Sequence, residues 1–103
     1  MKIVIVSACS AGIASTYMAA EALELAARKR GHEAHAETQG TLGIENEISP
    51  ALAQGADAVI FATDIAIQKR ERFAGKPILE VGVAEAIRHA EAVILRVERA
   101  AGG

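Results

Sequence analysis

The sequence predicts one α/β domain over residues 1–103, with helices on both faces of a four-stranded parallel sheet in three layers. Two continuous apolar runs, 3–6 and 58–62, are typical of strands buried on both faces. A helical pattern follows the first run, and strand and helix patterns then alternate along the chain. Such alternation favours a doubly wound parallel sheet with right-handed crossovers.

Composition excludes several classes of protein. Hydrophobic residues make up 51% of the 103 residues but aromatic residues only 3%, so the core is expected to consist of Ala, Val, Ile and Leu. A net charge of −2 disfavours a nucleic-acid partner. A single cysteine cannot form an internal disulfide, and it is compatible with a reducing cytoplasm. No apolar stretch approaches the roughly 20 residues of a membrane span, so we expect a cytoplasmic domain without a signal peptide or direct membrane insertion.

The first half of the chain predicts a long helix and a second strand. Apolar and small residues recur on one face of 16–30, and Gly31 follows as a left-handed residue that ends the helix. Residues 33–38 alternate between polar and small side chains, which predicts a strand with one wet face at the edge of the sheet. We expect a loop over 39–47.

The second half predicts two further helices and the remaining strands. Ser49 and Pro50 predict an N-cap and first helical residue, with Gly55 closing the short helix. Pro77 begins a strand over 77–81. At this first position the N–H that proline lacks is not needed for a hydrogen bond between strands. Apolar residues spaced by four and three predict one helix over 83–99.

The expected strand order is 2-1-3-4, as in flavodoxin-like folds, and it places two functional groups at one edge of the sheet. Ligands of such folds bind outside the carboxyl ends of the strands where the chain reverses direction, between strands 1 and 3. Cys9 and Asp64 follow those two strands. Asp64 has two interpretations, a residue facing the site or a cap of the next turn.

Cys9 lies in a loop of small residues between the first strand and the first helix. Such a loop directs backbone N–H groups at an anion, and a helix N-terminus favours the thiolate form of a cysteine. This arrangement predicts a nucleophile that is itself phosphorylated. The alternative is a small buried cysteine with a structural role.

Two related classes of protein are disfavoured. Low-molecular-weight tyrosine phosphatases have Cys-x5-Arg-Ser/Thr, whereas here Ser15 and Thr16 occupy the last two positions, so the arginine that clamps the phosphoryl group is missing. A flavin binder needs aromatic residues to enclose the ring, and Tyr17, Phe61 and Phe73 supply no suitable pair. No cofactor is expected.

The chain resembles the B domains (enzyme IIB) of the bacterial phosphoenolpyruvate-dependent sugar phosphotransferase system (PTS). The segment 8–23 is similar to the fructose-family pattern A-C-P-T-G-I-A-H-T-F-M-A-A-E-A-L. The segment 37–47 is similar to E-T-Q-G-x-x-G-x-E-N of the same family, and 64–66, 72–77 and 83–87 continue the likeness. The resemblance covers nearly the whole chain in separate blocks.

The resemblance implies a phosphocarrier with Cys9 as the phosphorylated residue. Cys9 would accept a phosphoryl group from a phosphohistidine of enzyme IIA and pass it to a sugar held by the membrane enzyme IIC, at the inner face of the plasma membrane. The expected phosphate-binding loop consists of Ser10, Ala11, Gly12, Ile13, Ala14, Ser15 and Thr16. The alternative is a regulatory or degenerate IIB-like binding module without efficient transfer.

The loop departs from the fructose pattern at three positions. Ser10, Ala11 and Ser15 stand where the family has Pro, Thr and His, and Cys-Ser-Ala-Gly resembles the loop of lactose/cellobiose-type B domains. The change at position 15 removes a proton donor or cationic neighbour of the thiolate. The sequence therefore predicts a fructose-like component.

Other polar residues are candidates for the site wall or for partner docking. Gln39, Gly40 and Asn46 lie in a segment that either turns the chain or forms such a wall. Arg72, with the neighbouring Lys69 and Arg70, forms either a solvated face or a surface that attracts a phosphorylated, acidic partner. The histidines do not have ligand spacing, so no metal site is expected; they are His32, His35 and His89.

Overall fold

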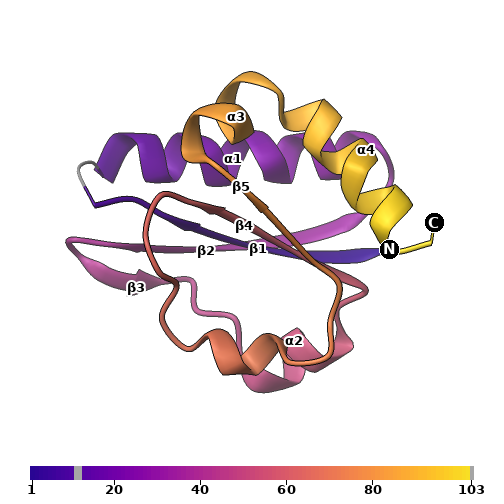
Figure 1. Ribbon diagram of the computed structural model, residues 1–103, viewed down its shortest axis with the longest axis horizontal. Helices are drawn as coiled ribbons and strands as arrows, with labels where there is room; N and C mark the ends of the chain where they lie inside the picture. Colours follow the sequence, from indigo (N-terminus) through magenta and orange to yellow (C-terminus); the bar gives the residue numbers. More distant parts are fainter. Residues whose placement is uncertain (11–12, 103) are drawn as a thin grey trace.

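Strand β1 (Lys2–Ala8) lies at the centre of a mostly parallel sheet in the computed structural model, which describes residues 1–10 and 13–102 (Figure 1). It pairs in parallel with β2 (Glu33–Gly40) on one side and with β4 (Ala58–Thr63) on the other. Strand β5 (Ile78–Val81) pairs in parallel with β4. The predicted order of the four parallel strands is confirmed.

A fifth strand corrects the predicted strand count. In the described part of the chain the order is β3-β2-β1-β4-β5, and β3 (Gly43–Glu45) runs antiparallel to β2. The expectation of a loop throughout 39–47 was therefore wrong. Gly43 has φ +89°, which lets the chain reverse within two residues and pair Gly43 with Gly40. A strand of three residues is too short to produce a readable alternation.

Strand β2 also differs from the expected wet edge strand. Its edge is covered by β3, and residues 36–39 are buried. Glu37 has no exposed surface, although its neighbours along the strand alternate between polar and small residues. The prediction failed because it assumed that polar side chains face water, whereas Glu37 and Gln39 bind other polar groups inside the protein.

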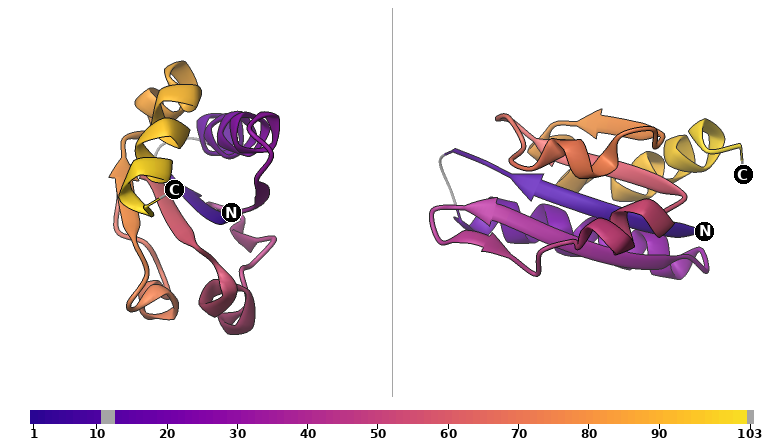
Figure 2. Two further views of the ribbon diagram at one scale, coloured as in Figure 1. Left: turned by 90° about the vertical axis from the view of Figure 1, so that its right-hand side faces the viewer. Right: turned by 90° about the horizontal axis from the view of Figure 1, so that it is seen from below.

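The helices form a layer on each face of the sheet (Figures 1 and 2). Helices α1 (Ile13–Lys29), α3 (Val83–Arg88) and α4 (Ala90–Ala100) cover one face. The short helix α2 (Pro50–Gly55) and the 3₁₀ helix η1 (Arg70–Phe73) cover the other. Successive residues of β1 enter the two cores in turn: Ile3 and Ile5 pack toward α1, and Val4 and Val6 toward α2.

The structure confirms the predicted start and end of α2 and the predicted role of Gly31 at the end of α1. Ser49 Oγ accepts a hydrogen bond from the Leu52 N–H at 3.1 Å, with Pro50 as the first residue of α2, which ends at Gly55. Gly31 has φ +82° two residues after Lys29, the last residue of α1, as predicted for a residue that terminates a helix.

The predicted single helix over 83–99 is instead two helices. His89, between α3 and α4, has φ −131° and ψ 41°, outside the helical region. The bend lets Val83 and Ala86 before it, and Val93 and Ile94 after it, reach the same core. Apolar spacing did not reveal the break because both segments keep a buried face.

Candidate functional site

The carboxyl ends of β1, β2 and β4 form the edge of the sheet that carries the predicted site. Ala8 pairs with Gln39 of β2 and with Thr63 of β4. The residues that follow, Cys9 and Asp64, therefore leave the sheet side by side. The order of the strands thus brings Cys9 and Asp64, which are 55 positions apart in the sequence, next to each other.

The thiol and the carboxylate face each other. Cys9 is half-buried, and its Sγ lies 3.9 Å from Asp64 Oδ2. The Asp64 backbone N–H donates to the Ala8 carbonyl at 3.3 Å, and Asp64 Oδ1 accepts from the Val83 N–H at the start of α3 at 3.4 Å. Asp64 thus faces the thiol, and its other oxygen binds the start of α3, whereas in the next turn the Ile65 N–H donates to Thr63 Oγ1.

The predicted phosphate loop includes the first turn of α1. Ile13 begins the helix, and Ala14, Ser15 and Thr16 follow in it, while Ala11 and Gly12 lie outside the described residues. The N–H groups of a first helical turn have no acceptor within the helix and favour anions.

The two ends of that loop are joined at its base. The buried Ser7 hydroxyl donates to the Thr16 carbonyl at 2.9 Å, which ties the end of β1 to the start of α1. Ser10 is exposed and Ser15 is half-buried. Ser7 was not among the predicted site residues, because a serine inside a buried strand belongs to no motif.

A cavity of about 210 Å³ lies beside Cys9. One wall comes from the end of β2 and its turn, and the opposite wall from the segment after β4. Its lining residues are Cys9, Ser10, Gln39, Gly40, Thr41, Ile65, Ala66 and Gln68. Of the candidates for the site wall, Gln39 and Gly40 therefore lie next to the thiol.

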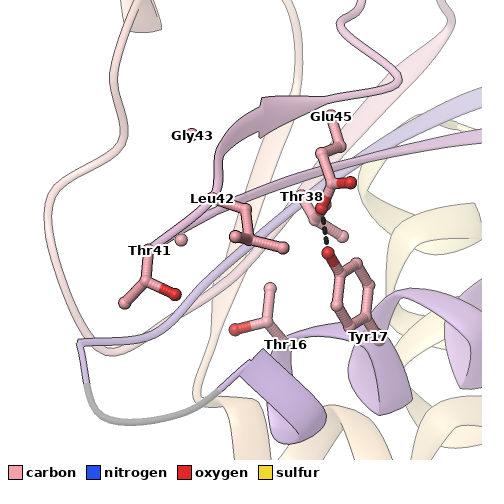
Figure 3. A pocket seen from close by; sticks show the side chains of 8 residues that line it. Thr16, Tyr17, Thr38, Thr41, Leu42, Gly43 and Glu45 are labelled. Carbon is pink, nitrogen blue, oxygen red and sulfur yellow. Dashed lines mark hydrogen bonds between the residues drawn. The ribbon is translucent and has the colours of Figure 1, made fainter.

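Another cavity lies between α1 and the β2–β3 turn (Figure 3). The Tyr17 hydroxyl donates to Glu45 Oε1 across it, from helix to hairpin. Its volume is about 10 Å³, the space of roughly one water molecule, so it cannot hold a phosphoryl group or a sugar. The Cys9 cavity is the candidate site, and the Tyr17–Glu45 contact holds the hairpin that forms one of its walls.

Arg72 lies in the interior rather than on the surface. Its guanidinium donates to Glu37 Oε1 at 2.6 Å and Oε2 at 3.0 Å, and 9% of the residue is exposed. Burial by itself raises the pKa of the Glu37 carboxyl, but hydrogen bonds from Arg72, Gln39 and the Ile48 N–H outweigh it and hold that pKa below its ordinary value. Glu37 was not predicted as the partner of Arg72, because the two residues lie 35 positions apart in the sequence.

The other candidates do not line the Cys9 cavity. Lys69 pairs with Glu47 at 2.7 Å and Arg70 with Glu80 at 3.3 Å, so both charges are matched at the surface. Asn46, with φ +54°, follows β3 and borders a groove with Tyr17 and His35 instead of the Cys9 cavity. No three His, Cys, Asp or Glu side chains in residues 1–10 and 13–102 converge as metal ligands. None of the helices in that same part of the chain is long and apolar enough to cross a bilayer.

Comparison with known proteins decides the family. The model of the family "PTS system, Lactose/Cellobiose specific IIB subunit" matches residues 4–96. The chain is 48% identical over 97 residues to the "PTS system fructose-like EIIB component 2" of Escherichia coli K12, covering 94% of this chain and 92% of that one. The chain belongs to the enzyme IIB family of the PTS.

Other enzyme IIB relatives agree with the fold and extend the comparison. The crystal structure of a predicted fructose-specific IIB from Escherichia coli superposes with a TM-score of 0.92 at 32% identity, covering 99% of this chain and 90% of that one. The "PTS system 2-O-alpha-mannosyl-D-glycerate-specific EIIABC component" of Escherichia coli K12 is 55% identical over 92 residues, 89% of this chain and 14% of that protein. Enzyme IIB components of the PTS are sugar phosphotransferases, and these relatives support a phosphocarrier role in sugar transport.

Proposed function

We propose that this enzyme IIB chain carries a phosphoryl group on Cys9 within a fructose-like PTS permease. The observation that carries the proposal is the position of the chain's single thiol, between the first turn of α1 and Asp64 and beside the 210 Å³ cavity. The donor is a phosphohistidine of enzyme IIA, and the acceptor is a sugar bound by the membrane enzyme IIC. A relative whose printed name joins A, B and C components supports these partners.

Each transfer is a displacement at phosphorus. The Cys9 thiolate forms an S–P bond as the N–P bond of the phosphohistidine breaks, and the imidazole leaves. A sugar hydroxyl then attacks the same phosphorus, the S–P bond breaks, the sulfur leaves as the thiolate, and the hydroxyl proton passes to solvent. The N–H groups at the start of α1 stabilise the dianion between these steps. In this scheme the domain works in the cytoplasm, at the inner face of the membrane through enzyme IIC.

The carboxylate of Asp64 favours onward transfer of the phosphoryl group over a long-lived adduct on Cys9. At 3.9 Å from Sγ, its carboxylate is placed to accept the thiol proton as the nucleophile forms. The carboxyl then loses that proton to solvent, and its restored negative charge repels the dianion on Cys9 and shortens the lifetime of the adduct. Position 15 is serine rather than the arginine of the phosphatases, so that clamp does not oppose the release.

The test is phosphorylation by a reconstituted phosphoenolpyruvate relay with radiolabelled phosphate, followed by mapping of the labelled residue. We expect the label on Cys9 and its transfer to sugar when enzyme IIC is added. Alkylation of Cys9 or the Cys9→Ser variant should abolish onward transfer while the protein stays folded. Near-normal sugar phosphorylation by Cys9→Ser would contradict the proposal, and a folded wild type that accepts no label would favour the regulatory, IIB-like alternative.

A further inference from the structure

The side chain of Gln39 joins the two walls of the Cys9 cavity. Its Nε2 donates to the Gln68 carbonyl at 3.1 Å, and its Oε1 accepts from the Gln68 N–H at 2.8 Å. A side chain at the end of β2 thereby holds the backbone of the segment after β4 by two hydrogen bonds. Gln39 and Gln68 both line the cavity, so these bonds set the separation of its walls.

The amide of Gln39 is itself fixed by the ion pair beneath it. Its Nε2 also donates to Glu37 Oε2 at 2.7 Å, and a carboxylate in an ion pair only accepts hydrogen bonds, so the orientation of the amide is determined. Arg72 Nη2 donates to the same Glu37 oxygen at 3.0 Å and to the Gln68 carbonyl at 3.2 Å. Gln39 is 3% exposed and Glu37 is fully buried, which makes these bonds strong and hard to replace with water.

The segment that Gln39 holds, residues 64–68, begins beside the Cys9 thiol. Asp64, whose carboxylate faces Cys9 Sγ, starts it, and Ile65 and Ala66 line the cavity between Asp64 and Gln68. Movement of Gln68 away from Gln39 would change both the width of the cavity and the place of the Asp64 carboxylate relative to sulfur.

We infer that Gln39 is a positioning residue for phosphoryl transfer at Cys9. It acts through the backbone of Gln68, and Glu37 and Arg72 hold it in place. The inference rests on the proposed function, since the reaction it positions is the transfer to and from Cys9. A misplacement of about 1 Å near reacting atoms can cost up to about a hundredfold in rate.

The test compares Gln39→Met, which keeps the side-chain length and removes its hydrogen bonds, with the control Gln54→Met. Gln54 donates a side-chain hydrogen bond to the Arg72 carbonyl at 3.3 Å and does not line the Cys9 cavity. Urea unfolding, the alkylation rate of Cys9 against pH, and kcat and KM for transfer to sugar are measured for each protein.

We expect Gln39→Met to lower kcat for transfer by about tenfold and to move the pH midpoint of alkylation down by roughly half a unit, because the Asp64 carboxylate is freed to move from the sulfur. Gln54→Met should show at most a loss of stability. If Gln39→Met does not fold, Arg72→Lys replaces it in the test. This variant keeps a positive charge beside Glu37 but loses the hydrogen bond from Arg72 Nη2 to the Gln68 carbonyl. It should lower both kcat and the pH midpoint of alkylation.

Equal effects of Gln39→Met and Gln54→Met on alkylation and on kcat would show that Gln39 has only a structural role and would overturn the inference. So would an unchanged alkylation midpoint together with unchanged kcat. The alkylation measurement does not depend on a phosphoryl donor. A wild type that accepts no phosphoryl group would therefore contradict the proposed function, while the alkylation comparison still decides whether Gln39 positions the surroundings of the thiol.

Discussion

Arg72 binds both carboxylate oxygens of Glu37 inside the protein, with Nη1–Oε1 at 2.6 Å and Nη2–Oε2 at 3.0 Å. The Ile48 N–H also donates to Glu37 Oε1 at 2.7 Å, and Arg72 Nη1 donates to the Ile48 carbonyl at the same distance. The pair therefore links β2, the segment before α2, and η1. A buried pair with this many hydrogen bonds is costly to break from one side.

Arg72→Met should lower the free energy of unfolding at pH 7 by about 3–5 kcal/mol, because it leaves the buried Glu37 carboxylate without its partner. Without Arg72, burial dominates and raises the pKa of Glu37, so the loss should shrink as the pH falls toward about 5 and the carboxyl takes up a proton. Urea unfolding at both pH values measures this.

The matched control is Arg96→Met, which breaks an exposed pair with Glu85 at 2.9 Å. Its cost should not exceed about 1 kcal/mol. A loss for Arg72→Met as small as that of the control would mean that Glu37 reaches water or another donor when the arginine is removed.

Asp64→Asn should lower the pKa of the Cys9 thiol. The substitution removes a negative charge whose oxygen lies 3.9 Å from Sγ, and that charge disfavours the thiolate. Since the chain has one cysteine, the rate of alkylation against pH reports on this residue alone. Asp57→Asn is the control, because Asp57 binds the Lys2 N–H at the opposite end of the sheet. An alkylation midpoint that rises, or that moves equally in both variants, would contradict the assigned contact.

Ser15→Arg should lengthen the lifetime of the Cys9 phosphoryl adduct and slow its transfer to sugar. The substitution restores the phosphatase spacing Cys-x5-Arg-Thr in the first turn of α1, where a guanidinium can bind two phosphoryl oxygens. Ser15→His should change the rate or pH dependence of transfer with little effect on stability. Leu25→Arg adds the same charge farther along α1 as a control. Equal lifetimes in all these proteins would mean that position 15 does not face the phosphoryl group.

Glu98 should stabilise the protein at neutral pH and make its stability fall as the solution becomes acidic. Hydrogen bonds from Arg30 and then His32 lower its pKa from the ordinary 4.5 to about 2. Because the folded-state value is depressed, the stabilisation is present above about pH 4.5 and is lost as the pH falls toward 2. Glu98→Gln should therefore be less stable at pH 7 and should show a flatter decline of the urea midpoint over that interval. Glu91→Gln, on the same helix, is the control; a decline as steep in Glu98→Gln as in wild type would contradict this assignment.

The sequence by itself determined the order of the parallel strands and the edge of the sheet that carries the site. Continuous apolar runs identify inner strands, and the handedness of parallel crossovers leaves few ways to arrange them. Those rules were enough to place Cys9 and Asp64 at the same edge, where the structure has them 3.9 Å apart. The likeness of segments spread along the chain then sufficed to recognise the family.

Only the tertiary structure decided which polar residues are buried and what they bind. Glu37 was expected on a wet strand and Arg72 on a charged surface or in the site, yet they pair 35 residues apart, and Gln39 binds a backbone 29 residues away. The short β3 and the break at His89 likewise left no signal in the spacing of apolar residues. The physical reason is that burying a polar group is unfavourable or favourable according to its partner, and partners distant in sequence meet only once the sheet has formed.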